Sequence, residues 1–331
     1  MKGDWISHDT HRLALGCMGL GGSWNDKSYD QNHIKQAELA IETALEQGIH
    51  FFDHADIYAR GKAEAVFGEF LKSKPGVREN IFIQTKCGIR LPGDPPGIEQ
   101  GRYDFSKKHI LDSVDQSLMR LKTEYLDMLL LHRPDPLVEP EEVAEAFENL
   151  NQNGKVREFG VSNHTPAQME LLLKYLTVPI RSNQIEFHLL HSGMLDGGIA
   201  GSPNPVDPSG LEGTIEYCRI HHIQIQAWSP ISKGFLSGRS YQGKDGKLKE
   251  RILKCKAKID EFSKKHHAPA EAIVVSWILH HPAKILPILG SKNPDRIRRC
   301  ARSLEVKLSR EEWFELYCLG PVSYTHLRAH E

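Results

Sequence analysis

The segment LDMLLLHRPDPLVEPEEVAEAFENLNQNGKVREFGVSN, residues 126–163, contains a complete strand–helix–strand unit. Residues 126–132 and 158–163 are short apolar runs of the kind that form buried strands. Between them, Val143, Phe147 and Leu150 recur at the spacing of one helix face. Pro140 stands at a first helical position and Gly154 just beyond the end, which are the boundaries those residues favour. The unit therefore predicts two neighbouring strands connected by an α-helix.

The same alternation recurs about eight times along the chain. Apolar runs of strand length lie at residues 13–20, 49–55, 81–86, 126–132, 158–163, 181–187, 223–229 and 284–290. Further helical stripes lie between them, one from Ile110 to Leu121 and another from Met169 to Leu176. Eight units without a break in composition predict an α/β fold with one (β/α)8 TIM barrel over residues 1–320. Ser309 and Glu312 have capping-box spacing and open an extra C-terminal helix.

A doubly wound sheet is the alternative arrangement of alternating strands and helices. Its nucleotide-binding fingerprint, GxGxxG, would follow a strand and open a helix. The run GCMGLGG at residues 16–22 superficially resembles that fingerprint, but its spacing differs and no helical pattern begins before about residue 31. We therefore expect the barrel.

Long connections rich in Gly and Pro follow several strands, at residues 91–104, 191–210 and 230–247. In a barrel, connections that leave strands lie on the C-terminal face, where active sites are built. Long loops in a compact domain usually serve as lids or ligand loops, although each one alone could also be a flexible insertion. These three segments are expected to surround a functional site.

The composition excludes several classes of protein. The chain has 331 residues, 26% of them charged, and a formal net charge of −1. This balance gives no electrostatic footprint for nucleic acid, and no apolar run is long enough to span a membrane. The N-terminal residues lack the apolar core of a secretory signal, and the six cysteines are scattered without a CxxC pair. We expect free thiols in a cytoplasmic protein that is a monomer or a weak homo-oligomer.

Reactive side chains stand at the ends of three consecutive predicted strands. Asp53 closes the second strand, Lys86 the third and His132 the fourth, while Tyr58 lies five residues beyond Asp53. Each alone has an ordinary explanation: a helix cap, a solvated lysine, a core histidine or a packed aromatic. Because barrel strands present such residues to one common mouth, the four together predict a proton-transfer site.

The predicted chemistry follows from the side chains themselves. A free phenol titrates near pH ~10, and a neighbouring ammonium lowers that value by about 1–3 units. Asp53 would pair with Lys86 and hold it beside Tyr58. The phenol would then donate a proton to a carbonyl oxygen as a hydride arrives at carbon, with His132 bonding the same oxygen.

Seven segments carry a resemblance to a known family. In order along the chain they are GIHFFDHADIY, TKCG, LDMLLLHRP, GVSN, NQIEF, AWSP and ILGSKNPDRI. Together they resemble the landmarks of the aldo-keto reductase superfamily, over roughly residues 12–320. The variants HADIY, KCGI, HRPDP and WSPI are most similar to those of bacterial YdhF-type oxidoreductases.

The resemblance implies a catalytic tetrad of Asp53, Tyr58, Lys86 and His132, the residues already selected by strand position. It also implies metal-independent reduction of aldehydes and ketones to alcohols by hydride transfer from NADPH. The small carbonyl substrate and the extended cofactor would meet at the barrel mouth. The residues implied to contact the cofactor are Asp53, Gly16, Cys17, Met18, Ser162, Asn163, Gln184, Trp228, Ser229, Pro230, Ile231 and Lys233. Of these, Trp228 would stack on the nicotinamide ring, and Ser162, Asn163 and Gln184 would bind its carboxamide.

The site of the cofactor 2′-phosphate would lie at residues 290–299. Gly290, Ser291 and Lys292 precede a cap-plus-proline helix start, and helix N-termini bind anions. Lys292 and Arg296 would add positive charge, so this segment favours NADP(H) over NAD(H). A solvated basic helix face is the alternative for the run Arg296, Arg298 and Arg299. The chain also departs from many relatives here, with Gly290 in place of lysine and with Arg299 and Cys300 in place of the adenine-binding Glu and Asn.

The substrate pocket is expected to include Trp24, Tyr58, His132, Arg133 and His188 together with the 191–210 loop. Arg133 could attract an acidic substrate, but a salt bridge with Asp135 is the interpretation that we favour for it.

Other functions remain open on the sequence alone. Lys86 could form a Schiff base in a lyase, which requires a neutral lysine. A metal-dependent hydrolase could use His54, Asp56, Cys87, His132 and His188, although no three of them have convincing ligand spacing. The chain could also be a cofactor-binding regulatory subunit. Such a subunit would keep the tetrad and would differ from the enzyme only in its low rate of aldehyde reduction.

The ends of the chain fall outside this scheme. Residues 1–12 are a poor sequence for the hairpin that usually plugs the barrel bottom. Residues 321–331, PVSYTHLRAHE, have neither periodicity nor a cap, and we expect them to be a frayed, non-native-looking tail.

Overall fold

The computed structural model describes residues 11–25, 27–195 and 211–320. The expectations about an N-terminal hairpin, the tail at 321–331 and most of the 191–210 loop therefore concern residues outside the described part.

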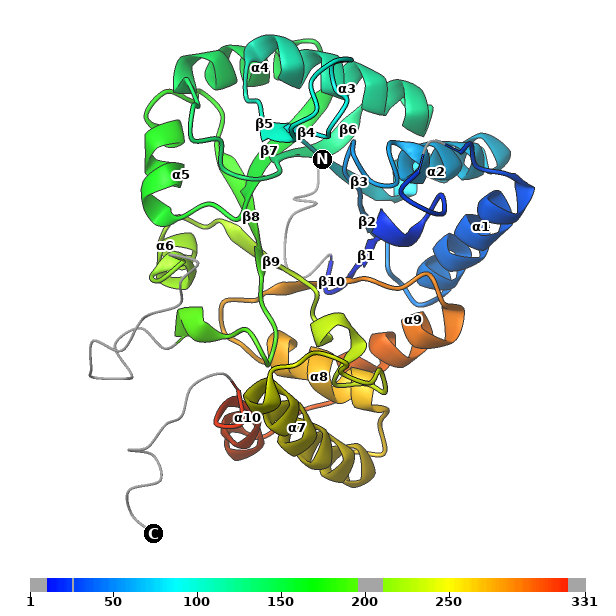
Figure 1. Cartoon of the computed structure of the whole chain (residues 1–331), viewed down its shortest axis with the longest axis vertical. Helices are drawn as coiled ribbons and strands as arrows, with labels where there is room; N and C mark the ends of the chain where they lie inside the picture. Colours follow the sequence, from blue (N-terminus) through cyan, green and yellow to red (C-terminus); the bar gives the residue numbers. More distant parts are fainter. Residues whose placement is uncertain (1–10, 26, 196–210, 321–331) are drawn as a thin grey trace.

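Eight parallel strands form a closed barrel, as predicted (Figure 1). They are β1 (Ala14–Gly16), β2 (Phe51–Asp53), β3 (Phe82–Cys87), β6 (Leu126–Leu131), β7 (Val156–Ser162), β8 (Ile180–Glu186), β9 (Gln224–Trp228) and β10 (Leu286–Leu289). Around the barrel their order is β1-β10-β9-β8-β7-β6-β3-β2, so each strand lies beside its neighbour in the chain. Each of the eight predicted apolar runs contains or overlaps one of these strands.

Helices form a ring outside the strands (Figure 1). They are α1 (Gln31–Glu46), α2 (Lys62–Ser73), α3 (Lys107–Leu121), α4 (Pro140–Gln152), α5 (Pro166–Leu173), α6 (Thr214–Ile220), α8 (Ala270–Leu279) and α9 (Pro294–Ala301). Two further helices, α7 (Gly246–Lys265) and α10 (Arg310–Tyr317), pack together outside the ring. The predicted start signals are confirmed: Pro140 begins α4, and the Ser309–Glu312 capping box begins α10.

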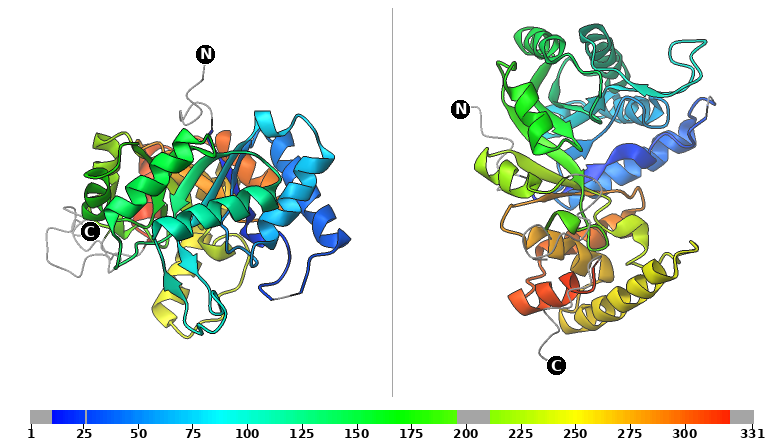
Figure 2. Two further views of the ribbon diagram at one scale, coloured as in Figure 1. Left: turned by 90° about the horizontal axis from the view of Figure 1, so that it is seen from above. Right: turned by 60° about the vertical axis from the view of Figure 1, so that its left-hand side comes forward.

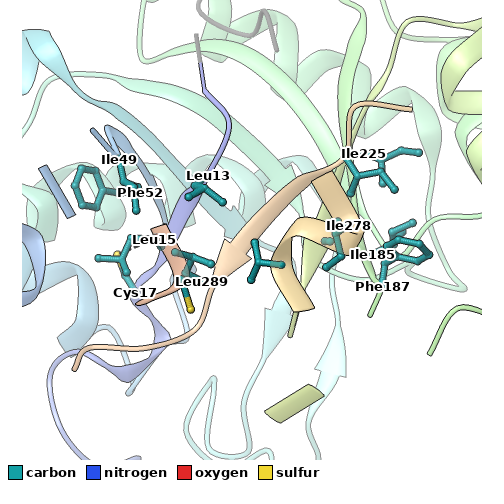
Figure 3. Packing of buried hydrophobic residues seen from close by; sticks show 14 of the residues in the cluster. Leu13, Leu15, Cys17, Ile49, Phe52, Ile185, Phe187, Ile225, Ile278 and Leu289 are labelled. Atoms are coloured by element: carbon teal, nitrogen blue, oxygen red, sulfur yellow. Dashed lines mark hydrogen bonds between the residues drawn. The ribbon is translucent and has the colours of Figure 1, made fainter. Parts of the chain in front are cut away.

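The core has two apolar layers. The larger one fills the space between strands and helices and includes Leu15, Phe52, Ile185 and Ile225 (Figure 3). The smaller one lies inside the barrel and contains Phe51 stacked on Phe82, with ring centroids 4.5 Å apart. Successive residues of a strand alternate between these layers, because side chains point to opposite faces.

The barrel interior changes from apolar to polar along the strands. Two residues beyond Phe51 on β2 comes Asp53, and two and four beyond Phe82 on β3 come Gln84 and Lys86. All three are buried, with at most 2% of their surface exposed. The smaller apolar layer inside the barrel, which we call the apolar floor, therefore ends where the strands approach their carboxyl ends.

The long connections leave the carboxyl ends of the strands, but one of them is more regular than expected. Most of residues 91–104 lie within a short antiparallel hairpin, which is formed by β4 (Ile89–Arg90) and β5 (Arg102–Tyr103). In side view this hairpin and the loop before α1 project from the same end of the barrel (Figure 2, left). No helix in the described part of the chain is long and apolar enough to cross a membrane.

Candidate active site

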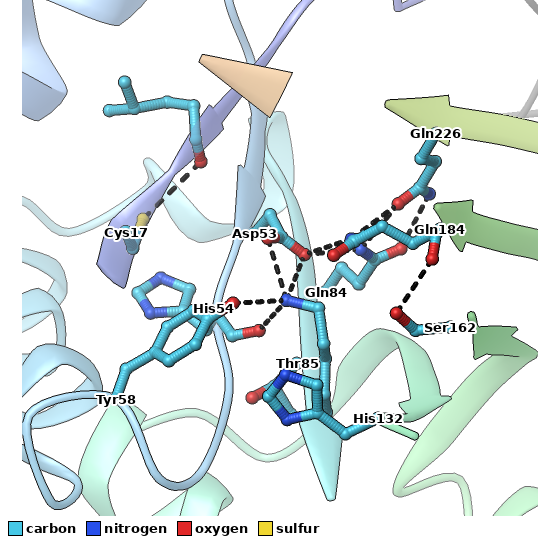
Figure 4. Close-up of polar contacts among 12 residues, drawn as sticks. Cys17, Asp53, His54, Tyr58, Gln84, Thr85, His132, Ser162, Gln184 and Gln226 are labelled. Atoms are coloured by element: carbon cyan, nitrogen blue, oxygen red, sulfur yellow. Dashed lines mark hydrogen bonds and ion pairs between the residues drawn. The ribbon is translucent and has the colours of Figure 1, made fainter. Parts of the chain in front are cut away.

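The four predicted tetrad residues converge at one end of the barrel. Asp53 ends β2, Lys86 lies near the end of β3, and His132 directly follows β6. Tyr58 reaches them from the turn after β2, which is fixed by backbone hydrogen bonds from Asp56 to Lys86 and from Tyr58 to Ala55. Figure 4 shows Asp53, Tyr58 and His132 close together at this end of the barrel.

Lys86 is the centre of the group and is completely buried. Its Nζ lies 2.8 Å from both carboxylate oxygens of Asp53, and it donates to the backbone oxygen of His54 at 2.7 Å. It also donates to the Tyr58 hydroxyl at 3.0 Å. Burial lowers the pKa of Lys86, but Asp53 and Tyr58 more than compensate, and the net pKa is raised. The lysine is therefore charged.

The pKa of Tyr58 departs from the expectation. Burial raises it, and although the Lys86 ammonium opposes this, the net pKa lies above the ordinary value of 10.0. The predicted lowering was wrong because it counted the neighbouring charge and omitted the desolvation of the phenolate. Tyr58 is therefore protonated at neutral pH and can donate its proton. The Lys86 ammonium lies 3.0 Å from the phenol oxygen.

His132 faces the same space. Its ring lies edge-on to that of Tyr58, with centroids 5.9 Å apart, and its Nδ1 is buried without a hydrogen-bond partner in the described part of the chain. Burial, followed by the charges of Lys86 and Arg133, holds the pKa of His132 well below 6.5. A neutral imidazole has one N–H to donate, so His132 can bond a carbonyl oxygen without carrying charge.

The loop before α1 forms one wall beside Tyr58. Trp24 lies edge-on to Tyr58 with ring centroids 6.4 Å apart. Lys62 holds this loop, because its Nζ donates to the backbone oxygens of Ser23, Asn25 and Lys27 at 2.8, 3.0 and 2.9 Å.

A cavity of about 350 Å³ opens at this end of the barrel. It is lined by Tyr103, Arg133, Pro134, Asn163, Glu186, His191, Leu211 and Trp228. The predicted substrate residue Arg133 and the predicted cofactor residues Asn163 and Trp228 thus meet in one place. Tyr103 and His191 lie in the 91–104 and 191–210 segments that were expected to surround the site, whereas sequence reasoning missed Pro134, Glu186 and Leu211. Of these, Glu186 stands at the end of β8, which is the same signal that selected Asp53.

One interpretation of a polar residue in this region needs correction. Arg133 makes no salt bridge with Asp135, whose oxygens accept from the backbone N–H groups of Phe105 and Leu137, each at 2.9 Å. The guanidinium of Arg133 instead lies 5.8 Å from the Trp228 ring centroid. The backbone donors satisfy Asp135, so Arg133 is left facing the cavity.

His188, predicted to contact substrate, is buried and is not among the residues that line this cavity. Its Nδ1 lies 3.0 Å from Ser232 Oγ, and its Nε2 lies 3.3 Å from Glu186 Oε1. These bonds tie the end of β8 to the loop after β9. We propose that His188 supports that loop, while Glu186 and His191 line the cavity.

The residues predicted to bind a nicotinamide are linked by hydrogen bonds. Trp228 Nε1 donates to Asn163 Oδ1 at 3.1 Å, and Asn163 Nδ2 donates to Ser162 Oγ at 2.8 Å. Ser162 Oγ donates to the backbone oxygen of Gln184 at 2.8 Å. Gln184 in turn reaches Asp53, at 2.9 Å. The group predicted for the cofactor and the tetrad therefore form one continuous network.

The remaining cofactor candidates surround this network. Cys17 is completely buried with its sulfur toward the Leu15 carbonyl, so its side chain is not available to a ligand. Met18 is 55% exposed. The loop with Ser229, Pro230, Ile231 and Lys233 is tightly wound, and Ser229 and Lys233 have positive φ angles of 57° and 55°.

The basic residues near α9 differ in their availability. Arg298 pairs with Glu46 and Asp295, and Arg299 pairs with Glu271 at 2.9 Å. By contrast, the buried Nε of Arg296 has no hydrogen-bond partner within the described residues. Lys292 touches only the neutral side-chain oxygen of Gln36 in the same part of the chain, at 2.9 Å. Within the predicted phosphate site, Lys292 and Arg296 are therefore the cations available to an anion.

Comparison with known proteins decides the family. A family model described as "Aldo/keto reductase family" matches residues 12–317. The chain belongs to the aldo/keto reductase family. It is accordingly an oxidoreductase of the group that uses a nicotinamide cofactor and carbonyl substrates.

Individual relatives support the assignment of this chain to the aldo/keto reductases. The oxidoreductase YdhF of Escherichia coli is 35% identical over 89% of this chain and 90% of that protein, which confirms the YdhF-type resemblance. A 6-dehydroglucose reductase of Agrobacterium fabrum is 36% identical, covering 93% of this chain and 94% of the relative. Among solved structures, a thermostable aldo-keto reductase in complex with epalrestat has a TM-score of 0.72 at 25% identity, covering 93% and 95% of the two chains.

The two alternative chemistries lack the arrangement that they need. A Schiff-base lysine must be neutral, but Lys86 is ion-paired with Asp53 and its pKa is raised. For a metal hydrolase, no three His, Cys, Asp or Glu side chains in the described ranges are grouped so as to hold a metal ion. His54, one of the candidate ligands, packs edge-on against Phe67.

Proposed function

We propose that this aldo/keto reductase reduces aldehydes or ketones to alcohols with NADPH, using Tyr58 as the proton donor. The observation that carries the proposal is the contact of Lys86 Nζ with both Tyr58 and Asp53, at 3.0 and 2.8 Å. NADPH would supply the hydride. Lys86 and Asp53 would fix the phenol, and the neutral His132 would orient the carbonyl oxygen.

Each residue of this site has one task in the proposed reaction. The substrate oxygen accepts hydrogen bonds from Tyr58 and His132, which polarises the carbonyl carbon toward the hydride. As the carbon–hydride bond forms, negative charge develops on that oxygen. Tyr58 then transfers its proton to the oxygen, and the Lys86 ammonium stabilises the resulting phenolate. Trp24, Arg133, Glu186 and His191 would surround the rest of the substrate.

The cavity favours a hydroxylated carbonyl compound as substrate. Its lining offers a cation, a carboxylate, an amide and an imidazole together with the faces of Tyr103 and Trp228. Such a mixture can bond several hydroxyl groups. One relative, at 36% identity, is named a 6-dehydroglucose reductase, and that substrate is a polyhydroxylated aldehyde. We therefore include sugar-like aldehydes in the proposed substrate class.

The pH dependence follows from two pKa directions. The pKa of Tyr58 is raised above 10.0, so the proton donor is lost only when the pH rises through that higher value. The pKa of His132 is lowered well below 6.5, so its neutral form persists down to more acidic pH. We expect kcat/KM for reduction to be flat between about pH 6.5 and 10. A titration limb centred near pH ~8 in a rate profile at saturating cofactor would contradict these assignments.

Cofactor choice is tested by fluorescence titration with NADPH and NADH in parallel. Charge-assisted hydrogen bonds to phosphate each contribute about 1.5–3 kcal/mol. Lys292→Met and Arg296→Met should therefore each weaken NADPH binding by about 10- to 100-fold and leave NADH binding nearly unchanged. Arg298→Met is the matched control, because Arg298 lies on the same helix but already pairs with carboxylates. Equal weakening of both cofactors in the test variants would remove the phosphate-site assignment.

A further inference from the structure

Three glutamines occupy the barrel interior directly above its apolar floor. Gln84 and Gln226 are completely buried, and Gln184 is 3% exposed. They come from different strands: β3, β9 and β8. Gln184 and Gln226 are register partners on adjacent strands, and so are Asp53 and Gln84. The hydrogen bonds between these two pairs cross the inside of the barrel (Figure 4).

Asp53 determines how these amides are oriented. A carboxylate only accepts hydrogen bonds, so the groups that face it must be amide NH2 groups. Oδ1 of Asp53 accepts from Gln84 Nε2 at 2.6 Å and from Gln184 Nε2 at 2.9 Å. It also lies 2.8 Å from Lys86 Nζ. Neither glutamine can turn over without placing an oxygen against this oxygen.

Gln226 closes the network. Its Oε1 accepts the second N–H of Gln84 at 2.9 Å and the second N–H of Gln184 at 3.0 Å. Its own Nε2 donates to Gln84 Oε1 at 2.8 Å, so Gln84 and Gln226 are joined in both directions. Both hydrogens of the Gln184 amide are thereby used. Oε1 of Gln184 accepts no hydrogen bond from the residues that the structure describes and is not among their buried unpaired atoms, so it is open to a ligand.

We infer that Gln84 and Gln226 are positioning residues that hold Gln184 as a hydrogen-bond acceptor for the NH2 group of the cofactor carboxamide. The inference rests on the proposed function, since it concerns the same nicotinamide site. Gln184, Asp53, Lys86 and Tyr58 then form one chain with links of 2.9, 2.8 and 3.0 Å. The amide network would thereby fix the position of the cofactor carboxamide relative to the proton donor Tyr58.

The test compares cofactors that differ only in the carboxamide. The 3-acetylpyridine analogue of NADPH replaces the NH2 group with a methyl group, whereas the thionicotinamide analogue keeps it. The wild-type protein should bind the acetyl analogue about 10- to 100-fold more weakly than NADPH, because Gln184 Oε1 loses its donor. The thionicotinamide analogue should show no comparable loss at Gln184.

The variants locate the cause of this discrimination. Gln184→Met should reduce the ratio of the two dissociation constants to near one. Gln226→Met removes an acceptor of Gln184 and should lower the ratio several-fold. Gln84→Met provides a second test of the same network and should also lower the ratio.

Two outcomes would overturn the inference. One is a wild-type ratio near one. The other is an unchanged ratio in folded Gln226→Met and Gln84→Met proteins. That result would mean that these two glutamines only pack the interior of the barrel. Wild-type protein that binds NADPH and reduces aldehydes in either case would leave the proposed function standing. Binding of neither dinucleotide would instead remove the proposed function itself.

Discussion

Replacement of Tyr58 by Phe is expected to lower carbonyl reduction by about 10²- to 10⁴-fold, the usual contribution of a positioned general acid. The substitution deletes one oxygen, which is the atom 3.0 Å from Lys86 Nζ, and keeps the ring that packs near Trp24 and His132. Nothing in the cofactor network from Trp228 to Gln184 depends on that oxygen. The dissociation constant for NADPH should therefore change little, while kcat falls.

Steady-state rates and a fluorescence titration on the same preparation measure these two quantities. Tyr29→Phe is a suitable control, because it also removes a phenol oxygen, but one that bonds Glu69 at 3.2 Å rather than the tetrad. Wild-type turnover in Tyr58→Phe would refute the tetrad assignment. A loss of NADPH binding equal to the loss of rate would assign Tyr58 a binding role.

Lys86→Met should abolish activity and also destabilise the protein. Asp53 is 2% exposed and would be left without its cation, and breaking a buried ion pair from one side costs about 3–5 kcal/mol. Tyr58 would lose the ammonium that stabilises its phenolate. We expect a loss of rate at least as large as that of Tyr58→Phe, together with a clear fall in the denaturant midpoint.

The double variant Lys86→Met with Asp53→Asn separates the two effects. The introduced asparagine would carry no charge but would keep an oxygen to accept from Gln84 and Gln184. Much of the lost stability should return, because no uncompensated charge remains buried, whereas the activity should not. If Lys86→Met alone were as stable as wild type and retained its rate, the central place of Lys86 in this site would be wrong.

The fold was predictable because its strands are buried on both faces. Such strands are continuous apolar runs, as in residues 126–132 and 284–290, and each of the eight runs contains or overlaps a barrel strand. The tetrad was predictable for a related reason. Asp53, Lys86 and His132 interrupt or follow apolar runs at their carboxyl ends, where a barrel leaves its interior open.

Other features depend on contacts that a linear pattern does not record. The β4–β5 hairpin is two residues long in each strand, too short to produce an alternating pattern. The direction of the Tyr58 pKa depends on burial, which opposes the charge that the sequence makes obvious. Arg133 and Asp135 are close in sequence, yet backbone N–H groups satisfy the aspartate.

The glutamine network is the clearest case of this kind. Gln84, Gln184 and Gln226 are far apart in the chain, and only Gln184 was predicted to belong to the functional site. Their meeting requires the barrel to be closed, because β3 and β9 are not neighbouring strands. Sequence alternation places each of them inside the barrel, but only the closed structure shows that they share Asp53.

Multiple turnover with NADPH tests the central claim most directly. Purified protein is mixed with an excess of NADPH and a panel of small aldehydes, including hydroxylated ones, and the loss of reduced nicotinamide absorbance is followed. The account predicts many equivalents of NADPH consumed per protein molecule, at a rate on the order of 1–10³ per second for the best substrate. Tight NADPH binding with no more than one equivalent consumed would contradict it and would favour a cofactor-binding regulatory role.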